Sequence, residues 1–342
     1  MEELSDRQKN ILTMVIHEYI RTAEPVGSKH IVENYRIDLS SATVRNELAE
    51  LTELGYLRQP HTSAGRVPTE EGYRYFVGRL MNTINLPEDT RRTISHQFYQ
   101  TPNDVNQWLK LAASILASQS RGASLVTAPH PQQAHFKHLE LVSTHGCQVL
   151  AVMVLEGGTI HQTLLTMEAP TSQEALSVTA ARFNDICLGR DGKFIQTLTA
   201  NVNATEKLVL GWISDTLTHA DTLGSGEVYL DGITNVLAEP EFSNSGEARR
   251  ALHLLEERSM LQDLLARTVL TANTEGVQVL IGGEGTWDEL RQCSIILARY
   301  GSPEQATGSL GVLGPMRMSY GRSISIVRFI SSLLSDLVAE QW

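Results

Sequence analysis

The chain has 342 residues and a formal net charge of −11, from 28 Lys and Arg residues against 39 Asp and Glu residues. Its length predicts two or three domains, and its acidic balance argues against indiscriminate binding of nucleic acid, which goes with an excess of Lys and Arg. The three cysteines form no CxxC pair, so we expect small buried residues rather than a disulfide framework or a zinc site: Cys147, Cys187 and Cys293. The start MEELSDRQ lacks the features of a signal peptide and no apolar run is long enough to span a bilayer, so we expect a cytoplasmic protein.

The first 55 residues predict three helices. Ser5 precedes a long amphipathic segment that ends at Thr22 to Pro25, and the short helical segment SKHIVENY follows it. A third helix begins after Ser40 or Ser41, either of which can cap it, and Gly55 closes it, since glycine adopts the left-handed conformation most easily. The apolar residues of this helix recur at spacings of 4, 3 and 3, as expected for one buried face: Val44, Leu48, Leu51 and Leu54.

A basic hairpin follows the three helices. The stretch from Tyr56 to Thr69 contains no Asp or Glu but carries Arg58, His61 and Arg66. Its two prolines lack an amide donor and are tolerated at sheet edges, which suits a hairpin with no further strands beside it. The tip, Thr62 to Gly65, offers hydroxyl and backbone donors to phosphate oxygens. Three helices before such a hairpin predict a winged helix-turn-helix, which sets a helix N-terminus against DNA base edges and its wing along the neighbouring backbone.

The expected DNA contacts follow from this geometry. Arginine suits guanine and asparagine suits adenine in the major groove, so Thr43, Arg45 and Asn46 are the expected base readers, while the short second helix and the hairpin contact phosphates. The full set of candidate DNA-binding residues is Lys29, Ser41, Thr43, Arg45, Asn46, Arg58, His61, Thr62, Ser63 and Arg66. Residues 1–80 nevertheless carry 10 Lys and Arg against 12 Asp and Glu. Binding must therefore rest on a few placed contacts, with the acidic side chains on other faces.

Four stretches carry a resemblance to a known family: LSDRQKNILTMVIHEYI, EPVGSKHI, SSATVRNELAELTELGYLRQPHTSAGRVPTEEGYRYFV and GSLGVLGPMRMSYGRSISIV. Over nearly its whole length the chain resembles the HrcA family of bacterial heat-shock repressors. The resemblance implies a homodimer that binds the CIRCE inverted-repeat operator upstream of chaperone operons of the groE and dnaK type. It also implies that the GroEL chaperonin is a partner that keeps the repressor active.

Beyond residue 81 the pattern changes to a mixed body of helices and strands. Asn82 to Pro87 is expected to be a linker, followed by a polar helix from about Glu88 and another helix from Asp104 to Gln119. Three apolar runs separated by glycine-containing turns predict an antiparallel meander: HLELVST, QVLAVMVL and TIHQTLLT. Helices are expected at Ser172 to Ile186 and Ala204 to Ala220. The later runs are GEVYLDGITNVL, a Leu-rich segment, VQVLIGG, CSIILARYG and GSLGVLGP, before a final helix.

Strands at both ends of this body, with helices between them, indicate a sheet interrupted by an insertion. The expected fold class is α+β and multidomain, with the winged helix-turn-helix first. The resemblance implies that a GAF-like α/β sheet domain follows and that it carries an inserted dimerisation domain. The expected ranges are 1–81 for the winged helix domain, 82–103 for a linker and helix, 104–172 with 271–342 for the GAF-like domain, and 173–270 for the insertion.

Other kinds of site are weaker candidates. Four histidines lie within sixteen residues without carboxylate or cysteine partners at a recognised spacing, so solvated histidines are favoured over a metal site: His130, His135, His138 and His145. The run from Gly282 to Gly285 lacks the GK[ST] of a phosphate loop. No catalytic constellation or cofactor motif stands out, so we expect neither an enzyme nor a bound cofactor. The alternative function is a metabolite-gated regulator of another regulon, in which the GAF-like domain binds a small molecule.

Overall fold

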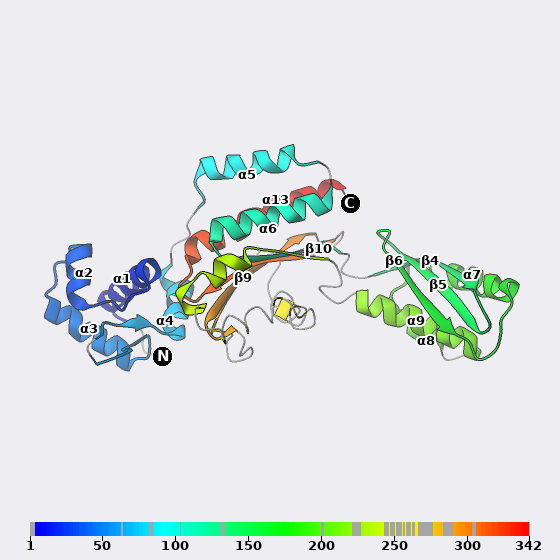
Figure 1. Cartoon of the computed structure of the whole chain (residues 1–342), viewed down its shortest axis with the longest axis horizontal. Coiled ribbons are helices and arrows are strands. Elements are labelled where there is room, and N and C mark those ends of the chain that lie inside the picture. Colours follow the sequence, from blue (N-terminus) through cyan, green and yellow to red (C-terminus); the bar gives the residue numbers. More distant parts are fainter. Residues whose placement is uncertain are drawn as a thin grey trace. The chain divides into compact units, whose positions relative to one another are not determined.

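The computed structural model describes residues 4–62, 64–81, 85–102, 104–130, 134–199, 202–220, 227–242, 276–282, 290–302 and 306–341, with single positions between 246 and 265. The candidate residue Ser63, the run 283–285 and most of the Leu-rich segment lie outside these residues. The chain separates into two compact units (Figure 1). The first unit comprises Met1–Ala128, Val228–Tyr300 and Ser309–Leu337, and the second comprises Pro129–Glu227, Gly301–Gly308 and Val338–Trp342.

The first unit begins with three helices and a two-stranded wing, in the order that the sequence predicts. These elements are α1 (Asp6–Thr22), α2 (Ser28–Tyr35), α3 (Ser41–Glu53), β1 (Leu57–Arg58) and β2 (Val67–Pro68). Helix α4 (Glu70–Tyr75) and a π-helical turn (Phe76–Leu80) follow. The wing is defined here as residues 57–68, and β1 and β2 pair antiparallel within it.

The capping residues predicted for α1 and α3 are found at the ends of these helices. Ser5 forms a capping box with Gln8 at the start of α1. Ser40, rather than Ser41, caps α3, because its hydroxyl accepts the Thr43 amide at 3.1 Å. Gly55 follows α3 with a φ of +85°, as predicted. One expectation is wrong: Leu54 was counted in the buried stripe but is 41% exposed, since it is the C-cap of α3 and lies beyond the face that packs inward.

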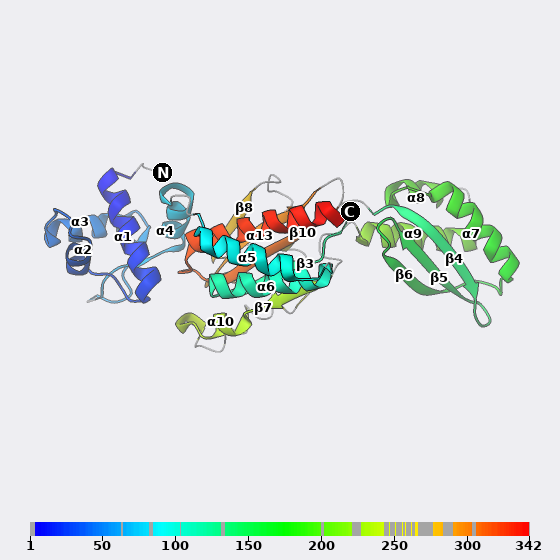
Figure 2. The same cartoon turned by 90° about the horizontal axis from the view of Figure 1, so that it is seen from above.

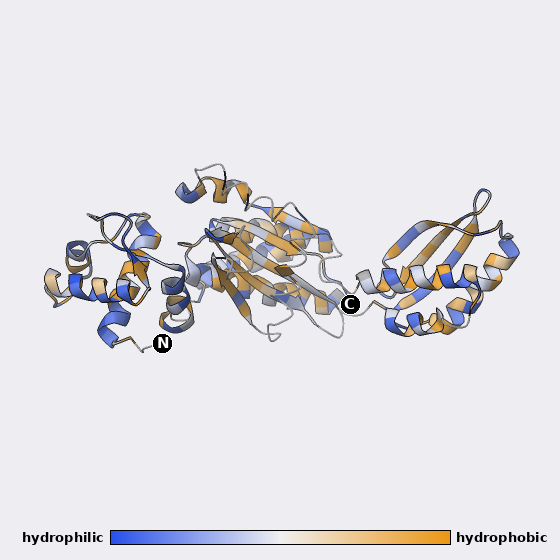
Figure 3. Ribbon diagram, turned by 90° about the horizontal axis from the view of Figure 1, so that it is seen from below, coloured by the Kyte–Doolittle hydropathy of each residue, from blue (hydrophilic) through white to orange (hydrophobic). Residues whose placement is uncertain are grey.

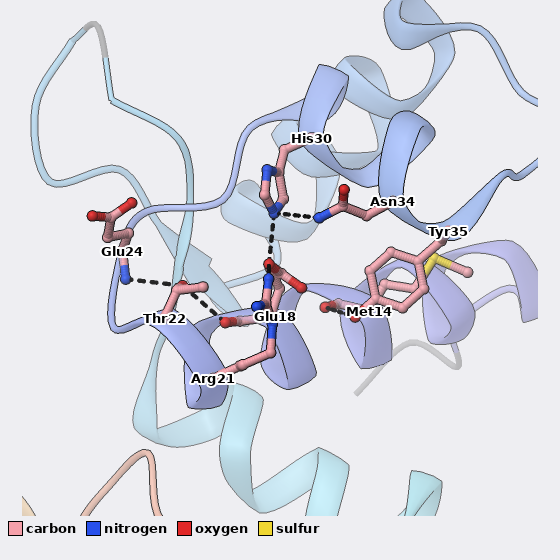
Figure 4. A network of polar contacts seen from close by, with 8 residues as sticks. All are labelled: Met14, Glu18, Arg21, Thr22, Glu24, His30, Asn34 and Tyr35. Atoms are coloured by element: carbon pink, nitrogen blue, oxygen red, sulfur yellow. Dashed lines mark hydrogen bonds and ion pairs between the residues drawn. The ribbon is translucent and has the colours of Figure 1, made fainter.

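A polar network on Glu18 joins α1 to α2 (Figure 4). Glu18 is 4% exposed, and its Oε1 accepts hydrogen bonds from Arg21 Nη2 and, at 2.6 Å, pairs with His30 Nε2. Asn34 Nδ2 also approaches His30 Nε2 at 2.8 Å. The hydrogen bond from Arg21 is the main cause that lowers the pKa of Glu18. This network fixes α2, which carries Lys29, on the scaffold helix α1.

Replacing Glu18 by Gln should therefore loosen the packing of α2 in a pH-dependent way. Because the folded-state pKa of Glu18 is lowered, its stabilising effect is present above the unfolded-state pKa of about 4.3 and is lost as the pH falls through the folded-state value. At pH 7 we expect amide hydrogen exchange across residues 6–35 to be about three- to tenfold faster in Glu18→Gln, the size of one net hydrogen bond. Exchange by mass spectrometry, corrected for intrinsic rates, measures this.

The matched control is Glu33→Gln, which makes the same charge change at an exposed position of α2. Exchange in that variant should equal the wild-type rate at both pH 7 and pH 4. The difference between Glu18→Gln and wild type should shrink at pH 4 and below. A difference that is independent of pH would contradict the role assigned to the ionised carboxylate.

A five-stranded sheet follows in the chain, with strand order β7-β3-β10-β9-β8. Its strands are β3 (Ala123–Thr127), β7 (Val228–Asp231), β8 (Val277–Ile281), β9 (Cys293–Gly301) and β10 (Thr307–Pro315). Helices α6 (Val105–Ser120) and α13 (Tyr320–Gln341) lie over one face of this sheet, and α5 (Glu88–Gln100) lies on the side of these two helices that faces away from the sheet (Figures 1 and 2). The opposite face of the sheet packs in an apolar cluster that includes Val236 of α10 (Ile233–Leu237) and Phe242 of the 3₁₀ turn Pro240–Phe242. In the part of the chain that the structure describes, no helix combines the length and apolar character needed to cross a membrane.

The second unit is built on the predicted meander. Its strands β4 (Phe136–Ser143), β5 (Gln148–Leu155) and β6 (Ile160–Thr166) pair antiparallel in chain order. Helices α7 (Gln173–Cys187), α8 (Gly192–Leu198) and α9 (Ala204–Ala220) share one buried apolar cluster with these strands. Hydrophobic and hydrophilic ribbon segments alternate along the helices (Figure 3), as expected for helices with one buried face. The cysteine expectation holds for Cys187 and Cys293, which are buried, whereas Cys147 is half-buried.

Among the residues that the structure describes, no helix covers one face of the meander, and this face is largely apolar. Residues on alternate positions of each strand face the α7–α9 core, and the intervening residues form the open face. The strand registers align nine of these residues in three rows: Val142–Leu150–Leu164, Glu140–Val152–Gln162 and His138–Val154–Ile160. Six of the nine are aliphatic, and the two at the β6 edge, Ile160 and Leu164, are 64% and 58% exposed.

The β4 edge of the same sheet is closed by side chains of α7. Asn184 accepts the Leu139 amide at 2.7 Å and donates to the Leu139 carbonyl at 3.0 Å. Gln173 does the same further along the strand, for the Ser143 amide and the Leu141 carbonyl. These two side chains occupy the backbone groups with which another strand would pair. The β4 edge of the sheet is therefore blocked, while the apolar face remains open among the described residues.

The division of the chain differs from the ranges expected from sequence. The meander was expected to belong to the sheet domain, with the insertion at 173–270, whereas its three strands form a separate sheet that shares a core with α7–α9. The strand β7 returns to the five-stranded sheet, where it pairs with β3. Apolar runs identify strands, but the partner of a strand depends on contacts between distant residues.

Candidate nucleic-acid interface

A groove of about 480 Å³ separates α3 from the wing. Its cations come from three different elements: Lys29 from α2, Arg45 from α3 and Arg66 from the wing. The remaining lining residues are uncharged: Val26, Gly27, Ser28, Leu48, Gln59, Thr62, Ala64 and Gly65. The lining thus contains three cations and no acid, so it favours an anion such as a phosphate group.

The candidate residues on the helices fall into two groups. Arg45 and Asn46 are exposed on α3, where they can reach a base edge. Ser41 and Thr43 are half-buried, and their hydroxyls already have partners, since Ser41 Oγ lies 3.0 Å from Ser28 Oγ and Thr43 Oγ1 lies 2.9 Å from Ser40 Oγ. The serine pair joins the first turns of α2 and α3. This contact between Ser28 and Ser41 aligns α2 with α3 at their N-terminal ends.

The candidate residues on the wing lie on different sides of it. Thr62 and Arg66 line the groove, and His61 is exposed at the tip. Arg58 does not line the groove but a separate polar pocket that also includes Tyr19 and Glu241. Gln59, the next residue, lines the groove instead, because successive residues of an extended strand point to opposite sides.

Backbone and side-chain contacts hold the wing in place. The backbones of Val26 and Arg66 exchange two hydrogen bonds of 2.8 Å. Gly65 lies so close to this crossing that a Cβ atom would meet the Val26 carbonyl carbon at 2.4 Å, so glycine is required there. Gln59 Nε2 donates to the Thr62 and Ala64 carbonyls at 2.9 and 3.0 Å, which closes the tip.

Three acidic side chains of this domain are engaged away from the groove, and no acidic residue lines it. Glu47 pairs with Arg7 of α1 at 3.2 Å, and Glu50 accepts from Gln8 at 2.9 Å. Glu18 is buried in the network with α2. The predicted separation of acids from the DNA-facing side therefore holds for the residues that line the groove.

Sequence reasoning did not single out three residues that shape this site: Ser28, Thr52 and Gln59. Thr52 and Gln59 belong to no motif, and their roles depend on contacts across the fold. Thr52 Oγ1 accepts from Arg66 Nε at 2.9 Å, a pairing between residues fourteen positions apart. Ser28 could have been suspected from its place at the start of α2, where a hydroxyl often meets a neighbouring helix turn.

The three helices, the wing and the acid-free groove define a winged helix-turn-helix DNA-binding domain, joined here to a larger α+β body; this is the architecture of a transcription regulator. Residues 3–79 match the family model described as "Winged helix-turn-helix transcription repressor, HrcA DNA-binding". Residues 106–324 match the model described as "HrcA protein C terminal domain". The chain belongs to the HrcA family of heat-inducible transcription repressors.

Relatives named "Heat-inducible transcription repressor HrcA" align with almost the whole chain. The one from Roseiflexus castenholzii is 44% identical over 99% of this chain and 95% of its own length. The one from Thermomicrobium roseum is 41% identical over 99% and 96%. A crystal structure titled as a hypothetical protein has a TM-score of 0.64 and 23% identity, covering 99% of this chain and all of that one, and it supports the fold. The relatives are repressors, a class of regulators rather than enzymes.

Proposed function

We propose that the protein represses chaperone operons of the groE and dnaK type by occupying the CIRCE inverted-repeat operator as a homodimer. The single observation that supports it most is the acid-free groove between α3 and the wing, in a chain of the HrcA family. Repression is by occupancy, since a dimer bound across a promoter excludes polymerase from it. In this proposal the repressor acts in the cytoplasm, where bacterial DNA lies.

In this proposal α3 enters the major groove and reads bases with Arg45 and Asn46. The wing and α2 contact the flanking backbone through Lys29, Thr62 and Arg66, with His61 at the tip. If each protomer neutralises roughly four phosphates, a dimer neutralises about eight, and affinity falls on the order of 10⁴-fold between 50 and 200 mM salt.

The salt dependence separates the groove cations from Arg58. Lys29→Gln should make the slope of log K against log salt less steep by about 0.9 per protomer, because one phosphate contact is lost. Arg58→Gln removes the same charge from the pocket that contains Glu241, and we expect it to leave the slope within error of wild type. Fluorescence titrations at four salt concentrations measure both slopes. An equal change in the two variants would contradict the assignment of phosphate contacts to the groove.

The homodimer is proposed to form through the open face of the second unit. A sheet face with six aliphatic side chains among nine positions is more apolar than an isolated soluble surface of this size normally is. A symmetric pair of such faces buries the same residues of both copies. The three polar positions, His138, Glu140 and Gln162, lie along two of the rows, and His138 pairs with Glu140 at 2.9 Å.

GroEL is the proposed partner that maintains activity, as the resemblance to the family implies. A chain that exposes the open face before it pairs presents a chaperonin with the apolar surface that chaperonins bind. When unfolded clients occupy the chaperonin, the repressor loses this help and the operons are released. Refolding with and without chaperonin, followed by operator titration, tests this partner; equal recovery of DNA binding would contradict it.

Footprinting on the promoters of the chaperone operons of the source genome is the experiment that tests the operator. We expect one protected inverted repeat, with the two protected half-sites related by symmetry. Scrambling one half-site should remove protection of both at low protein concentration, since the dimer binds them together. Protection elsewhere, released by a small molecule, would instead favour the metabolite-gated regulator.

A further inference from the structure

Arg66 is held by a side chain of α3. Thr52 Oγ1 donates its only proton to the Leu48 carbonyl at 2.7 Å, in the preceding turn of α3. Its lone pairs then accept the Arg66 Nε–H at 2.9 Å. Because the proton is already committed, the hydroxyl can act toward the guanidinium only as an acceptor.

We propose that Thr52 is a positioning residue for DNA binding, which holds the Arg66 guanidinium and the base of the wing at a fixed distance from α3. A guanidinium has five N–H donors, so the bond to Thr52 leaves four for a phosphate. The charge remains available while the side chain loses much of its rotamer freedom before DNA arrives. Less entropy is then lost on binding, and the contact is strengthened by preorganisation.

The backbone around Arg66 supports this role. Its amide and carbonyl are both bonded to Val26, in the segment between α1 and α2, so the main chain of Arg66 connects the wing to this segment and its side chain connects the wing to α3. Gln59 fixes the other end of the wing tip by its bonds to Thr62 and Ala64. The tip of the wing is thus held by Gln59, and Thr52 sets the angle between the wing and α3.

The test uses the full-length chain and duplex DNA of arbitrary sequence, because phosphate contacts carry no sequence information. The inference rests on the proposed phosphate contacts of the groove, but its result does not depend on which operator the protein recognises. Thr52→Val is close to isosteric and removes the acceptor. We expect it to weaken binding about three- to tenfold, the effect of one net hydrogen bond, and to make the salt slope less steep by up to about 0.9 per protomer.

Three further variants separate positioning from a general loss of structure. Thr52→Ser keeps the hydroxyl and should bind within twofold of wild type. Thr13→Val is the matched control, because Thr13 makes the same bond to a carbonyl four residues earlier, to Lys9 at 2.8 Å, but in α1. It should also bind within twofold of wild type. Arg66→Lys keeps the charge and lacks Nε, so it should resemble Thr52→Val in affinity.

The double variant Thr52→Val/Arg66→Lys should bind no more weakly than either single variant, because the two changes break one interaction. Additive losses would overturn the proposal, as would unchanged affinity in Thr52→Val or an equal loss in Thr13→Val. If Thr52→Val fails to fold, the comparison of Thr52→Ser with Arg66→Lys still decides it. A loss in Thr52→Ser as large as that in Arg66→Lys would then overturn it.

Discussion

A Leu164→Asp variant is expected to be a monomer that binds operator DNA about 10²- to 10⁴-fold more weakly than wild type. Leu164 is 58% exposed and lies in an aliphatic row with Val142 and Leu150 on the open face of the second unit. A carboxylate there would be desolvated twice in a symmetric interface, once from each protomer. Without the dimer the second half-site no longer benefits from a high effective concentration, which accounts for the size of the loss.

Sedimentation velocity and operator titration measure the two parts of this result. Val178→Asp is the matched control, because it makes the same kind of change at a residue of α7 that is 71% exposed, away from the open face. That variant should remain dimeric and bind normally. Leu164→Asp should also melt at about the same temperature as the exposed-site variant Val178→Asp. A dimeric Leu164→Asp, or a monomeric Val178→Asp, would exclude the open face as the interface.

An Arg45→Ala variant should lose most of its discrimination between operator and scrambled DNA. A bidentate arginine contact to guanine contributes about 1–3 kcal/mol per half-site, so a dimer loses about twice that. Arg45 is exposed on α3 and lines the groove with Lys29 and Arg66, so its removal leaves the buried stripe of the helix intact. Competition titrations with both DNAs report the specificity ratio directly.

Arg45→Lys separates the charge of this residue from its geometry. Lysine keeps the positive charge and therefore the salt slope, but it lacks the planar fork that matches two acceptors of guanine. We expect Arg45→Lys to bind scrambled DNA like wild type and to discriminate as poorly as Arg45→Ala. An unchanged specificity ratio in both variants would mean that α3 does not read bases through this residue.

The outcomes expected for the Arg45 and Leu164 variants together explain how an acidic chain would bind DNA. Each protomer offers three cations in a groove whose lining contains no acid, so one domain alone is expected to bind weakly at physiological salt. In the proposed dimer, pairing of the second units would double the DNA contacts without adding net positive charge to the surface. Specific binding to an inverted repeat then requires both halves.

The amino-acid sequence by itself determined the local elements of the DNA-binding domain. Caps such as Ser40 and Gly55, and the buried residues Val44, Leu48 and Leu51, act within one or two helical turns, so α3 could be placed almost to the residue. The acid-free hairpin and the helices before it were enough to predict a winged helix-turn-helix. The meander strands were likewise predicted, since alternation and turn residues are short-range signals.

Only the tertiary structure decided which elements combine and which side chains share a surface. The meander joins α7–α9 rather than the five-stranded sheet, because strand pairing depends on residues far apart in the chain. Arg58 and Arg66 are equivalent in a charge count, yet only Arg66 lines the groove. The acceptor that holds Arg66, on Thr52, belongs to no motif, since its role arises only where the wing folds back onto α3.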